Sequence, residues 1–202
     1  MAQPGENVAL PEPSVTGPNS LEQLLAQRRS IRDYQTAKLK LAEIGQLLWA
    51  AQGITHLQGL RTAPSAGALY PLELYVVTGR MEGLAQGVYH YDPGHHQLTK
   101  TVDGDLRDAL ARAALSQGWI KPAPSIIVFT ADYERTTRKY GKRGIRYVHI
   151  EVGHAAQNLF LQSESLGLAT VVVGAFNDDE VARMLRLPAD IQPLLLMPVG
   201  RK

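Results

Sequence analysis

The residues best suited to bind a ligand are a cluster of arginines near the start of the chain. Arg28, Arg29 and Arg32 surround Ser30 in the stretch that ends at Tyr34. Guanidinium groups hold phosphate with paired hydrogen bonds and keep their charge at physiological pH. A solvated basic helix end would have the same composition, because cations complement the C-terminal end of a helix dipole. The cluster alone is compatible with both, and a second stretch favours a phosphate clamp.

This second stretch is a loop of small residues placed directly before an apolar strand. The loop spans residues 61–71 and is bracketed by prolines, and its centre reads Pro64, Ser65, Ala66 and Gly67. Small side chains and glycine let a backbone approach a flat ligand closely. The loop is therefore a second candidate for ligand contact.

Two helices are predicted in this part of the chain, and the first of them leads to the arginines. Ser20 and Gln23 form a capping box, and leucines at helical spacing lead from it to the arginine cluster. A second apolar stripe from Leu41 to Ala51 predicts another helix, which Gly53 would end in the left-handed conformation. We expect both helices to face the core.

The rest of the chain predicts a mixed sheet with further helices. Strands are expected at residues 72–78, 87–91, 97–102, 125–130, 170–176 and 194–199, with a hairpin turn at residues 92–94. Asp103 would cap a helix that Gly118 stops, and Asn177 would cap a short one through Leu185. The longest helix is expected at residues 145–166, where His154 lies among small residues that suit close packing against a second copy or other helices.

Composition restricts the class of protein. A chain of 202 residues with 45% hydrophobic and 20% charged residues predicts a globular protein with one domain. The net charge of +2 and the lack of lysine runs argue against nucleic-acid binding, and 0 cysteines exclude disulfides and thiolate sites. Neither a signal sequence nor a long apolar segment is present, so we expect no membrane association and a cytoplasmic location. Proline-rich residues 1–19 are expected to be a flexible N-terminal arm.

Several familiar site motifs do not apply. His149 and His154 would point about 140° apart on a helix and the order around Glu151 is not His-Glu-x-x-His, so no metal site is expected. Ala63 stands where a nucleophile elbow needs glycine, which disfavours a serine hydrolase. The chain also lacks a Gly-x-Gly-x-x-Gly fingerprint after a strand and a Walker loop.

In combination, the motifs resemble the FMN-dependent nitroreductase superfamily, and more closely its SagB-type branch of thiazole/oxazole-forming dehydrogenases. The resemblance covers Leu21 to Arg201. It rests on Arg28-Arg29-Ser30-x-Arg32-x-Tyr34, Pro64-Ser65-Ala66-Gly67-Ala68-Leu69-Tyr70-Pro71, Lys139-Tyr140-Gly141 with Arg146-Tyr147, Glu151-x-Gly-His-x-x-Gln-Asn158 and Gly167-Leu168. It implies an α+β fold with a mixed, mainly antiparallel sheet flanked by helices, in which residues 20–202 form a single FMN-binding domain. It also implies an intertwined homodimer with FMN in each of two interface clefts.

The resemblance further implies a role for each matching residue. Arg28 and Ser30 would hold the FMN phosphate and ribityl oxygens, Arg29 would contact the cofactor through its backbone, and Arg32 would lie near the pyrimidine ring. A fixed cation there would stabilise the negative charge that reduction leaves at flavin N1 and O2. The remaining implied contacts are the loop Pro64, Ser65, Ala66 and Gly67 from the second subunit, the turn Val173, Gly174 and Ala175, and a further phosphate contact from Arg201.

Two features depart from the family pattern or leave alternatives open. Ala68 stands where many nitroreductases carry asparagine, so one side-chain contact to the ring edge is missing. Lys139 and Tyr140 match a pair that helps remove the substrate proton in azoline dehydrogenases. The same residues also suit a solvated basic face that includes Arg135 and Arg143.

The resemblance implies a homodimeric FMN oxidoreductase that passes a hydride between flavin N5 and a small-molecule donor or acceptor, with NAD(P)H as a candidate donor. An azoline dehydrogenase of peptide modification and a non-catalytic flavin-binding module are the alternatives. Binding of another phosphate compound by the arginines is a third. Sequence does not distinguish the acceptors.

Overall fold

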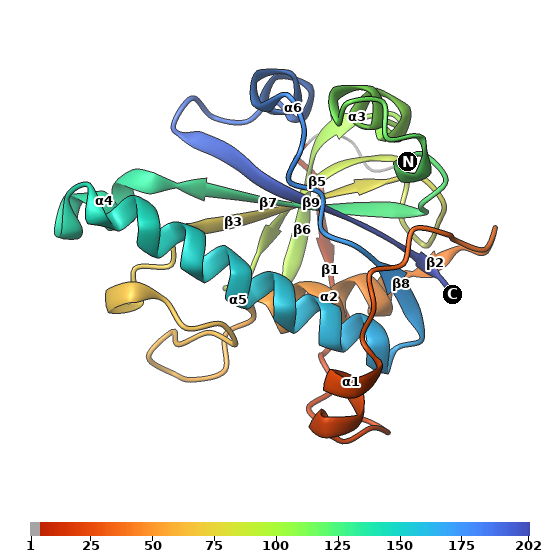
Figure 1. The fold of residues 1–202 in the computed structure, drawn as a ribbon, viewed down its shortest axis with the longest axis horizontal. Helices are drawn as coiled ribbons and strands as arrows, with labels where there is room; N and C mark the ends of the chain where they lie inside the picture. The colour runs from red at the N-terminus through yellow and green to blue at the C-terminus, as the bar shows by residue number, and fades with distance from the viewer. Residues whose placement is uncertain (1–4) are drawn as a thin grey trace.

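The computed structural model describes residues 5–202, and its centre is a seven-stranded sheet (Figure 1). The strands of this sheet are β1 (Asn7–Ala9), β3 (Leu72–Thr78), β5 (Gly87–Asp92), β6 (Gln97–Asp103), β7 (Ser125–Asp132), β8 (Leu168–Thr170) and β9 (Ile191–Arg201). They lie in the order β1-β6-β5-β3-β7-β9-β8, and every neighbouring pair is antiparallel. The short strands β2 (Leu39–Lys40) and β4 (Met81–Glu82) form a separate parallel pair. The predicted α+β fold with a mainly antiparallel sheet is confirmed.

Helices cover both faces of the sheet (Figure 1). They are α1 (Leu21–Gln27), α2 (Leu41–Gln52), α3 (Arg107–Ala113), α4 (Tyr133–Tyr140), α5 (Arg143–Ser165) and α6 (Asp178–Leu185), with 3₁₀ turns at Ala66–Ala68 and Gly118–Ile120. The side chains of α2 and α5 pack on one face, and those of α3 and α6 on the other. Among these residues, 5–202, no helix has both the length and the apolar character needed to cross a membrane.

The alternation of side chains along the central strands builds two cores, one on each face. On β3, Leu74 and Val76 join the cluster of α2 and α5, whereas Tyr75 and Val77 join the cluster of α3 and α6. This period of two places successive side chains on opposite faces. The strand is buried on both sides, and this is why it reads as a continuous apolar run.

The two helices that were expected to face the core differ. α2 does so, with Ile44, Leu47 and Leu48 fully buried. α1 begins at the predicted capping box, but none of its residues is buried, and Leu21 and Leu25 are 57% and 54% exposed. The prediction was wrong for α1 because this helix contacts α5 at the rim of the chain and does not reach the sheet.

Several element ends also differ from the prediction. Gly53 ends α2 with a φ of −63°, so its role is space: a Cβ there would lie 2.2 Å from the Trp49 ring. The carboxylate that accepts from the first turn of α3 belongs to Asp105 and not Asp103, which ends β6. Gly118 starts a 3₁₀ turn, since α3 ends earlier, at Ala113.

Two further corrections concern segments that later form the site. The expected strand at residues 170–176 is present only as β8, which ends at Thr170, because β9 offers Val173 a single isolated bridge at Leu196. Residues 133–140, read as a basic stretch, form helix α4, whose N-cap is Asp132.

The N-terminal segment differs from the flexible arm that was expected at residues 1–19, of which 1–4 lie outside the described residues. β1 pairs with β6, and Leu10 is buried against Gly45 of α2. Gln46 receives the Ser14 backbone N–H at 2.8 Å and returns a hydrogen bond to the Ser14 carbonyl. These backbone bonds attach the segment to its own chain.

Candidate functional site

The arginine segment lies along the edge formed by β8 and β9. The Ile31 backbone N–H donates to the Thr170 carbonyl at 3.0 Å, and that of Gln35 donates to the Arg201 carbonyl at 3.1 Å. Gly200 permits this close approach, because a Cβ there would lie 2.7 Å from the ring of Tyr34. The segment is thereby attached to the sheet at both ends.

Within this segment the three guanidinium groups have different surroundings. The Arg28 guanidinium lies over the Phe160 ring, 5.0 Å from its centroid, and that of Arg32 lies 5.4 Å from the centroid of Trp119. Arg29 instead donates from Nη1 to the carbonyls of Ala26 and Arg28, at 3.0 and 2.7 Å. Ser30 is exposed between them.

Sequence reasoning missed the two aromatic partners, Phe160 and Trp119. Each is far from its arginine in the chain and lies in an element of its own, α5 or the 3₁₀ turn Gly118–Ile120. No local spacing rule connects residues at such separations, so only the folded chain reveals the pairs.

The turn at Val173, Gly174 and Ala175 is close to the same edge. Val173 exchanges two backbone hydrogen bonds with Leu196, both of 2.9 Å, and the Ala175 carbonyl accepts from Gln117 Nε2 at 3.1 Å. The chain reaches this turn three residues after Thr170, which binds the arginine segment. Arg28, Arg29, Ser30, Arg32 and the turn are therefore brought together.

Arg201 lies on the same edge, but its side chain is already paired. Its Nη1 is 2.7 Å from Glu43 Oε1 of α2. A carboxylate in contact would compete with a phosphate for the same guanidinium. This geometry disfavours the expected phosphate contact of Arg201.

The loop Pro64, Ser65, Ala66 and Gly67 forms a second group of predicted residues, together with Lys139 and Tyr140. Ser65 Oγ accepts the Tyr70 backbone N–H at 2.9 Å. Gly67 has a φ of +65°, and a Cβ on it would lie 2.8 Å from Tyr140 Oη and 3.0 Å from Lys139 Nζ. Glycine is thus required both by its conformation and by the two side chains that contact it.

Two non-glycine residues of this loop also have positive φ, Ala68 at 53° and Tyr70 at 47°. A left-handed conformation costs an ordinary residue about 1–2 kcal/mol. Such strain is commonly found where a loop serves a ligand. The strain accords with the expectation that this loop is functional.

A buried polar cluster lies behind the loop. Arg61 donates to Gln52 Oε1 at 2.8 Å and lies over the Tyr70 ring, 4.6 Å from the centroid. Glu151 of α5 is 2% exposed, and its Oε1 has no hydrogen-bond partner within the described chain. Burial raises the pKa of Glu151 to about 7, although the Ser65 hydroxyl and the Arg61 guanidinium lower it.

From sequence, Glu151 was considered as a metal ligand and as part of a family motif, and not as a buried acid. A sharper signal was available, because Glu151 occupies a core position of the α5 stripe between Val148 and Ala155. Acidic residues are rarely buried without a partner. A carboxyl group on the apolar face of a helix is therefore a candidate for an unusual role.

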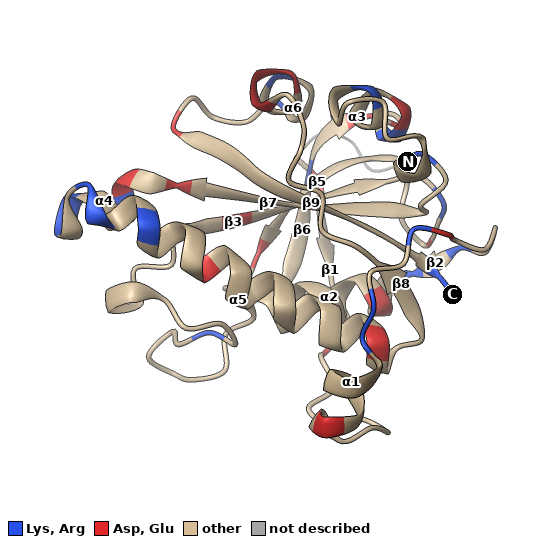
Figure 2. Ribbon diagram, in the orientation of Figure 1, with Lys and Arg blue, Asp and Glu red and all other residues tan. Residues whose placement is uncertain are grey.

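Helix α4 and the start of α5 gather cations beside the loop (Figure 2). Arg135 fixes α4 to this region, since it contacts Glu73 Oε1 at 2.5 Å and donates to the Tyr70 carbonyl at 3.2 Å. Arg138 pairs with Glu134 at 2.8 Å on the solvent side. Lys139 differs from both, because it contacts the loop at Gly67 and lies 5.4 Å from the Tyr140 ring centroid.

The two groups lie toward opposite ends of α5. Tyr140 packs on Tyr147 near the start of the helix, with ring centroids 5.1 Å apart, whereas Arg28 packs on Phe160 near its end. At 1.5 Å per residue, Tyr147 and Phe160 are about 20 Å apart along the helix axis. One chain alone therefore keeps the two groups of predicted residues apart.

Comparison with known proteins identifies the family. The sequence profile described as "Nitroreductase family" matches residues 25–201, which is most of the chain. The chain belongs to the nitroreductase family. It is 50% identical over 182 residues to a candidate nitroreductase of Methanocaldococcus jannaschii, and the match covers 90% of this chain and 91% of that one. A weaker similarity, 27% over 146 residues, links it to the microcin B17-processing protein of Escherichia coli and covers 69% and 54% of the two chains.

Solved structures agree with this family assignment. A nitroreductase-family protein of Ralstonia eutropha superposes with a TM-score of 0.85 at 32% identity, over 100% of this chain and 94% of that chain. A chain of the Escherichia coli microcin synthetase complex has a TM-score of 0.75 at 24% identity over 96% and 78% of the two chains, which shows a shared fold. The resemblance to the nitroreductases is confirmed, whereas the link to the SagB-type branch is supported only by distant relatives.

Proposed function

We propose that this nitroreductase-family protein is a homodimeric FMN-dependent oxidoreductase whose two sites each combine residues of both chains. The observation that carries the proposal is the separation of the predicted residues along α5 into two groups, which we call half-sites. The first half-site is the arginine segment with the turn at residues 173–175, and the second is the loop at residues 64–67 with Lys139 and Tyr140. An antiparallel pairing of two α5 helices about a two-fold axis would place the first half-site of one chain beside the second half-site of its partner. The dimer would then contain two complete sites, each built from both chains.

Gly153 supports such a pairing. It lies midway between Tyr147 and Phe160 on α5, is exposed, and a Cβ on it would meet no atom within 4 Å in its own chain. Glycine inside a helix costs about 1 kcal/mol relative to alanine, and the fold of one chain gives no reason for it. Close approach of a second helix at this point supplies the reason.

The leucines of α1 support it as well, because none of them is buried. Leu21 and Leu24 line a surface hollow of about 390 Å³ together with Trp49 of α2 and Leu161 of α5. An amphipathic helix without a buried residue gains little from its own chain. A second subunit that covers α1 would bury these side chains.

The donor set at the first half-site suits FMN. Arg28 and Ser30 would hold the phosphate and ribityl oxygens, and Arg32 would face the pyrimidine edge of the isoalloxazine. Backbone groups of the turn at residues 173–175 would face the ring, and the partner's loop at residues 64–67 would cover its other edge. Bound FMN supplies hydride exchange at N5, and the protein orients the ring and supplies positive charge near N1 and O2.

The first test is the visible absorption spectrum of the purified protein after incubation with FMN, recorded anaerobically before and after NADPH and then NADH. We expect one FMN per chain and bleaching by at least one of the two donors. A protein that takes up no FMN would refute the proposal. A bound flavin that neither donor reduces would contradict the NAD(P)H link and favour a dehydrogenase or a non-catalytic flavin-binding module.

A second candidate, an azoline-type dehydrogenase, is favoured by one observation. Lys139 and Tyr140 both contact Gly67 of the loop expected at the flavin, so they lie where a substrate proton could be removed. The similarity to the microcin B17-processing protein points the same way.

Substitution of Lys139 tests this candidate. Lys139→Ala is expected to retain FMN and to lower turnover by about 100-fold, the contribution typical of a general acid or base. Lys142→Ala is the matched control, because Lys142 is an exposed cation three residues away, and it should leave turnover within about twofold of the wild type. Equal turnover in Lys139→Ala and wild type would show that Lys139 is not catalytic and would favour the interpretation as a solvated basic face.

A further inference from the structure

Within residues 5–202, the Arg32 guanidinium lies over the face of an aromatic ring. Its guanidinium carbon lies 5.4 Å from the centroid of Trp119. For residues 5–202, the structure records no hydrogen bond or ion pair from this guanidinium. A cation–π contact supplies no oxygen acceptor, so the N–H donors of the guanidinium that point away from the ring remain free for a ligand.

Arg28 is held in the same way. Its guanidinium carbon lies 5.0 Å from the centroid of Phe160, and its backbone N–H closes α1 on the Leu24 carbonyl. As with Arg32, the described part of the chain offers its side-chain donors no hydrogen-bond partner. Arg29 and Arg201 differ, because their donors are already used by backbone carbonyls and by Glu43, respectively.

Phe160 is a fixed platform. It is 9% exposed and belongs to the core cluster that α2 and α5 form on the sheet. A ring in a close-packed core cannot move freely. The plane that supports Arg28 is thus set by the main core of the molecule.

Trp119 is also fixed, by the loop that precedes it. Leu115 and Ser116 both have positive φ, 55° and 58°, so the loop is held in a strained conformation. Gln117 holds it, since its Nε2 donates to the carbonyls of Ala114 and Ala175 at 2.9 and 3.1 Å. The second of these bonds ties the Trp119 platform to the turn expected to face the flavin ring.

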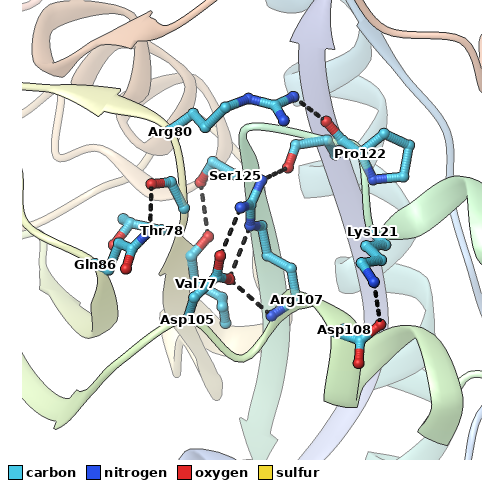
Figure 3. A network of polar contacts seen from close by, with 12 residues as sticks. Val77, Thr78, Arg80, Gln86, Asp105, Arg107, Asp108, Lys121, Pro122 and Ser125 are labelled. Carbon is cyan, nitrogen blue, oxygen red and sulfur yellow. Dashed lines mark hydrogen bonds and ion pairs between the residues drawn. The ribbon is translucent and has the colours of Figure 1, made fainter. Parts of the chain in front are cut away.

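A network of polar contacts next to Trp119, between α3 and β7, completes the support of this residue (Figure 3). Arg107 of α3 is 9% exposed, and it donates to Asp105 Oδ1 at 2.8 Å and to the Ala123 carbonyl at 2.7 Å. Arg80 donates to the Pro122 carbonyl, and Lys121 pairs with Asp108 at 2.9 Å. The segment between α3 and β7 is therefore anchored on both sides of Trp119.

We infer that Trp119 and Phe160 are positioning residues that hold Arg32 and Arg28 through cation–π contacts, so that N–H donors of the two guanidinium groups stay free for two different parts of one flavin, its pyrimidine edge and its phosphate. The inference rests on the proposed function, because it takes FMN as the ligand. Neither aromatic residue contacts the flavin in this scheme. Each acts through its arginine.

The two pairs are distinguished by the charge of the group that each arginine would meet. The FMN phosphate has the same charge in oxidised and reduced flavin, so Phe160 should affect the binding of both states equally. The pyrimidine edge gains negative charge on reduction, so Trp119 should affect the reduced state more. The ratio of the two dissociation constants separates these effects, and it also fixes the reduction potential of the bound flavin.

The experiment measures the dissociation constants of oxidised and of two-electron-reduced FMN, the latter anaerobically, for Phe160→Leu, Trp119→Leu and Trp119→Phe. Phe160→Leu is expected to weaken both states by about three- to tenfold, the range of a cation–π contact. Trp119→Leu should weaken the reduced state by about that factor and the oxidised state by less. Trp119→Phe keeps an aromatic face and should restore most of the ratio.

A double-mutant cycle tests that Trp119 acts through Arg32. In the Arg32→Gln background, Trp119→Leu should not change the ratio further, whereas a purely structural role of Trp119 would lower affinity in both backgrounds. An unchanged ratio in Trp119→Leu, or an unchanged affinity in Phe160→Leu, would overturn the inference. A wild-type chain that binds FMN in neither state would instead refute the proposed function itself.

Discussion

The arginines of the first half-site show how one residue type serves three purposes. Arg28 and Arg32 rest on aromatic faces, Arg29 donates to the backbone at the end of α1, and Arg201 pairs with Glu43. A guanidinium can bind a new anion well only if its donors are not already satisfied. The contacts inside the chain therefore rank Arg28 and Arg32 above the other two as ligand-binding groups.

This ranking makes a prediction about neighbouring residues. Arg28→Ala is expected to weaken FMN binding by about 10- to 100-fold, the loss of a hydrogen-bonded charge on the phosphate. Arg29→Ala is the matched control, because it removes the same charge one residue along and should weaken binding less than about threefold. Titration of each apoprotein with FMN provides the measurement, and equal losses in the two variants would contradict the assignment.

At the residue scale, the spacing of Arg28 to Tyr34 and of Pro64 to Gly67 gave two candidate stretches, and their roles at a site stay a prediction. Sequence did not predict what the side chains of these stretches contact. The contact of Lys139 with Gly67 and the aromatic platform beneath Arg32 join distant segments. Such contacts depend on the tertiary fold and have no signature in local sequence.

Among the elements, the loop at residues 61–70 depends on α2 and α5 for its shape. Arg61 bonds Gln52 of α2, and Asn158 of α5 donates to the Thr62 carbonyl at 3.2 Å. Glu151 lies in the same interior, and among residues 5–202 both its Oε1 and the Gln52 Nε2 lack partners. The packing of the loop against α2 and α5 is therefore expected to depend on whether the Glu151 carboxyl group is protonated.

The pKa of Glu151 predicts the direction of that sensitivity. Burial raises it from 4.5 to about 7, so between these values the folded state binds a proton that the unfolded state has lost. Glu151 therefore makes the free energy of unfolding fall as pH rises from 4.5 to 7, by up to about 3 kcal/mol. Below pH 4.5 both states are protonated, and this loss is absent.

Glu151→Gln tests this expectation with an isosteric, uncharged side chain. The variant should gain stability relative to wild type at pH 8, by about 1–3 kcal/mol, and should match it near pH 5. Urea unfolding at the two pH values and one protein concentration provides the comparison. A variant that is less stable than wild type at pH 8 would show that the ionised carboxylate has a favourable partner.

The elements that sequence predicted well are those whose pattern reflects burial in their own chain. β3, β7 and α5 carry long apolar patterns, and the structure forms them near the expected bounds. α1 carries a leucine stripe as well, but its own chain does not cover it. Residues 171–176 are apolar and begin with three β-branched valines, yet they form no strand because β9 pairs with them only at Val173. An apolar sequence pattern indicates that a surface will be buried, but the tertiary structure determines which element buries it.

For the molecule as a whole, the position of Gly153 predicts that self-association and cofactor binding are coupled. Gly153→Leu places a large side chain where a second α5 is expected to approach, so the variant should sediment as a monomer and should lose FMN in parallel. Arg112→Leu adds similar apolar bulk at an exposed position of α3, on the other face of the sheet, and should retain both properties. Analytical ultracentrifugation with detection at the flavin absorbance measures both at once. A Gly153→Leu dimer with full FMN would contradict the proposed interface.

The place of β9 in the sheet has a consequence for synthesis on the ribosome. β9 comes after all the other strands of the described chain, yet it lies between β7 and β8 and carries the edge to which the arginine segment attaches. Until it emerges, β7 has an unpaired edge, and the segment from Arg28 to Tyr34 lacks its anchor at Arg201. Open edges of this kind are prone to wrong pairing. The nascent chain is therefore expected to need chaperone protection from the emergence of β7 until β9 follows, and to become competent for cofactor only when β9 has paired.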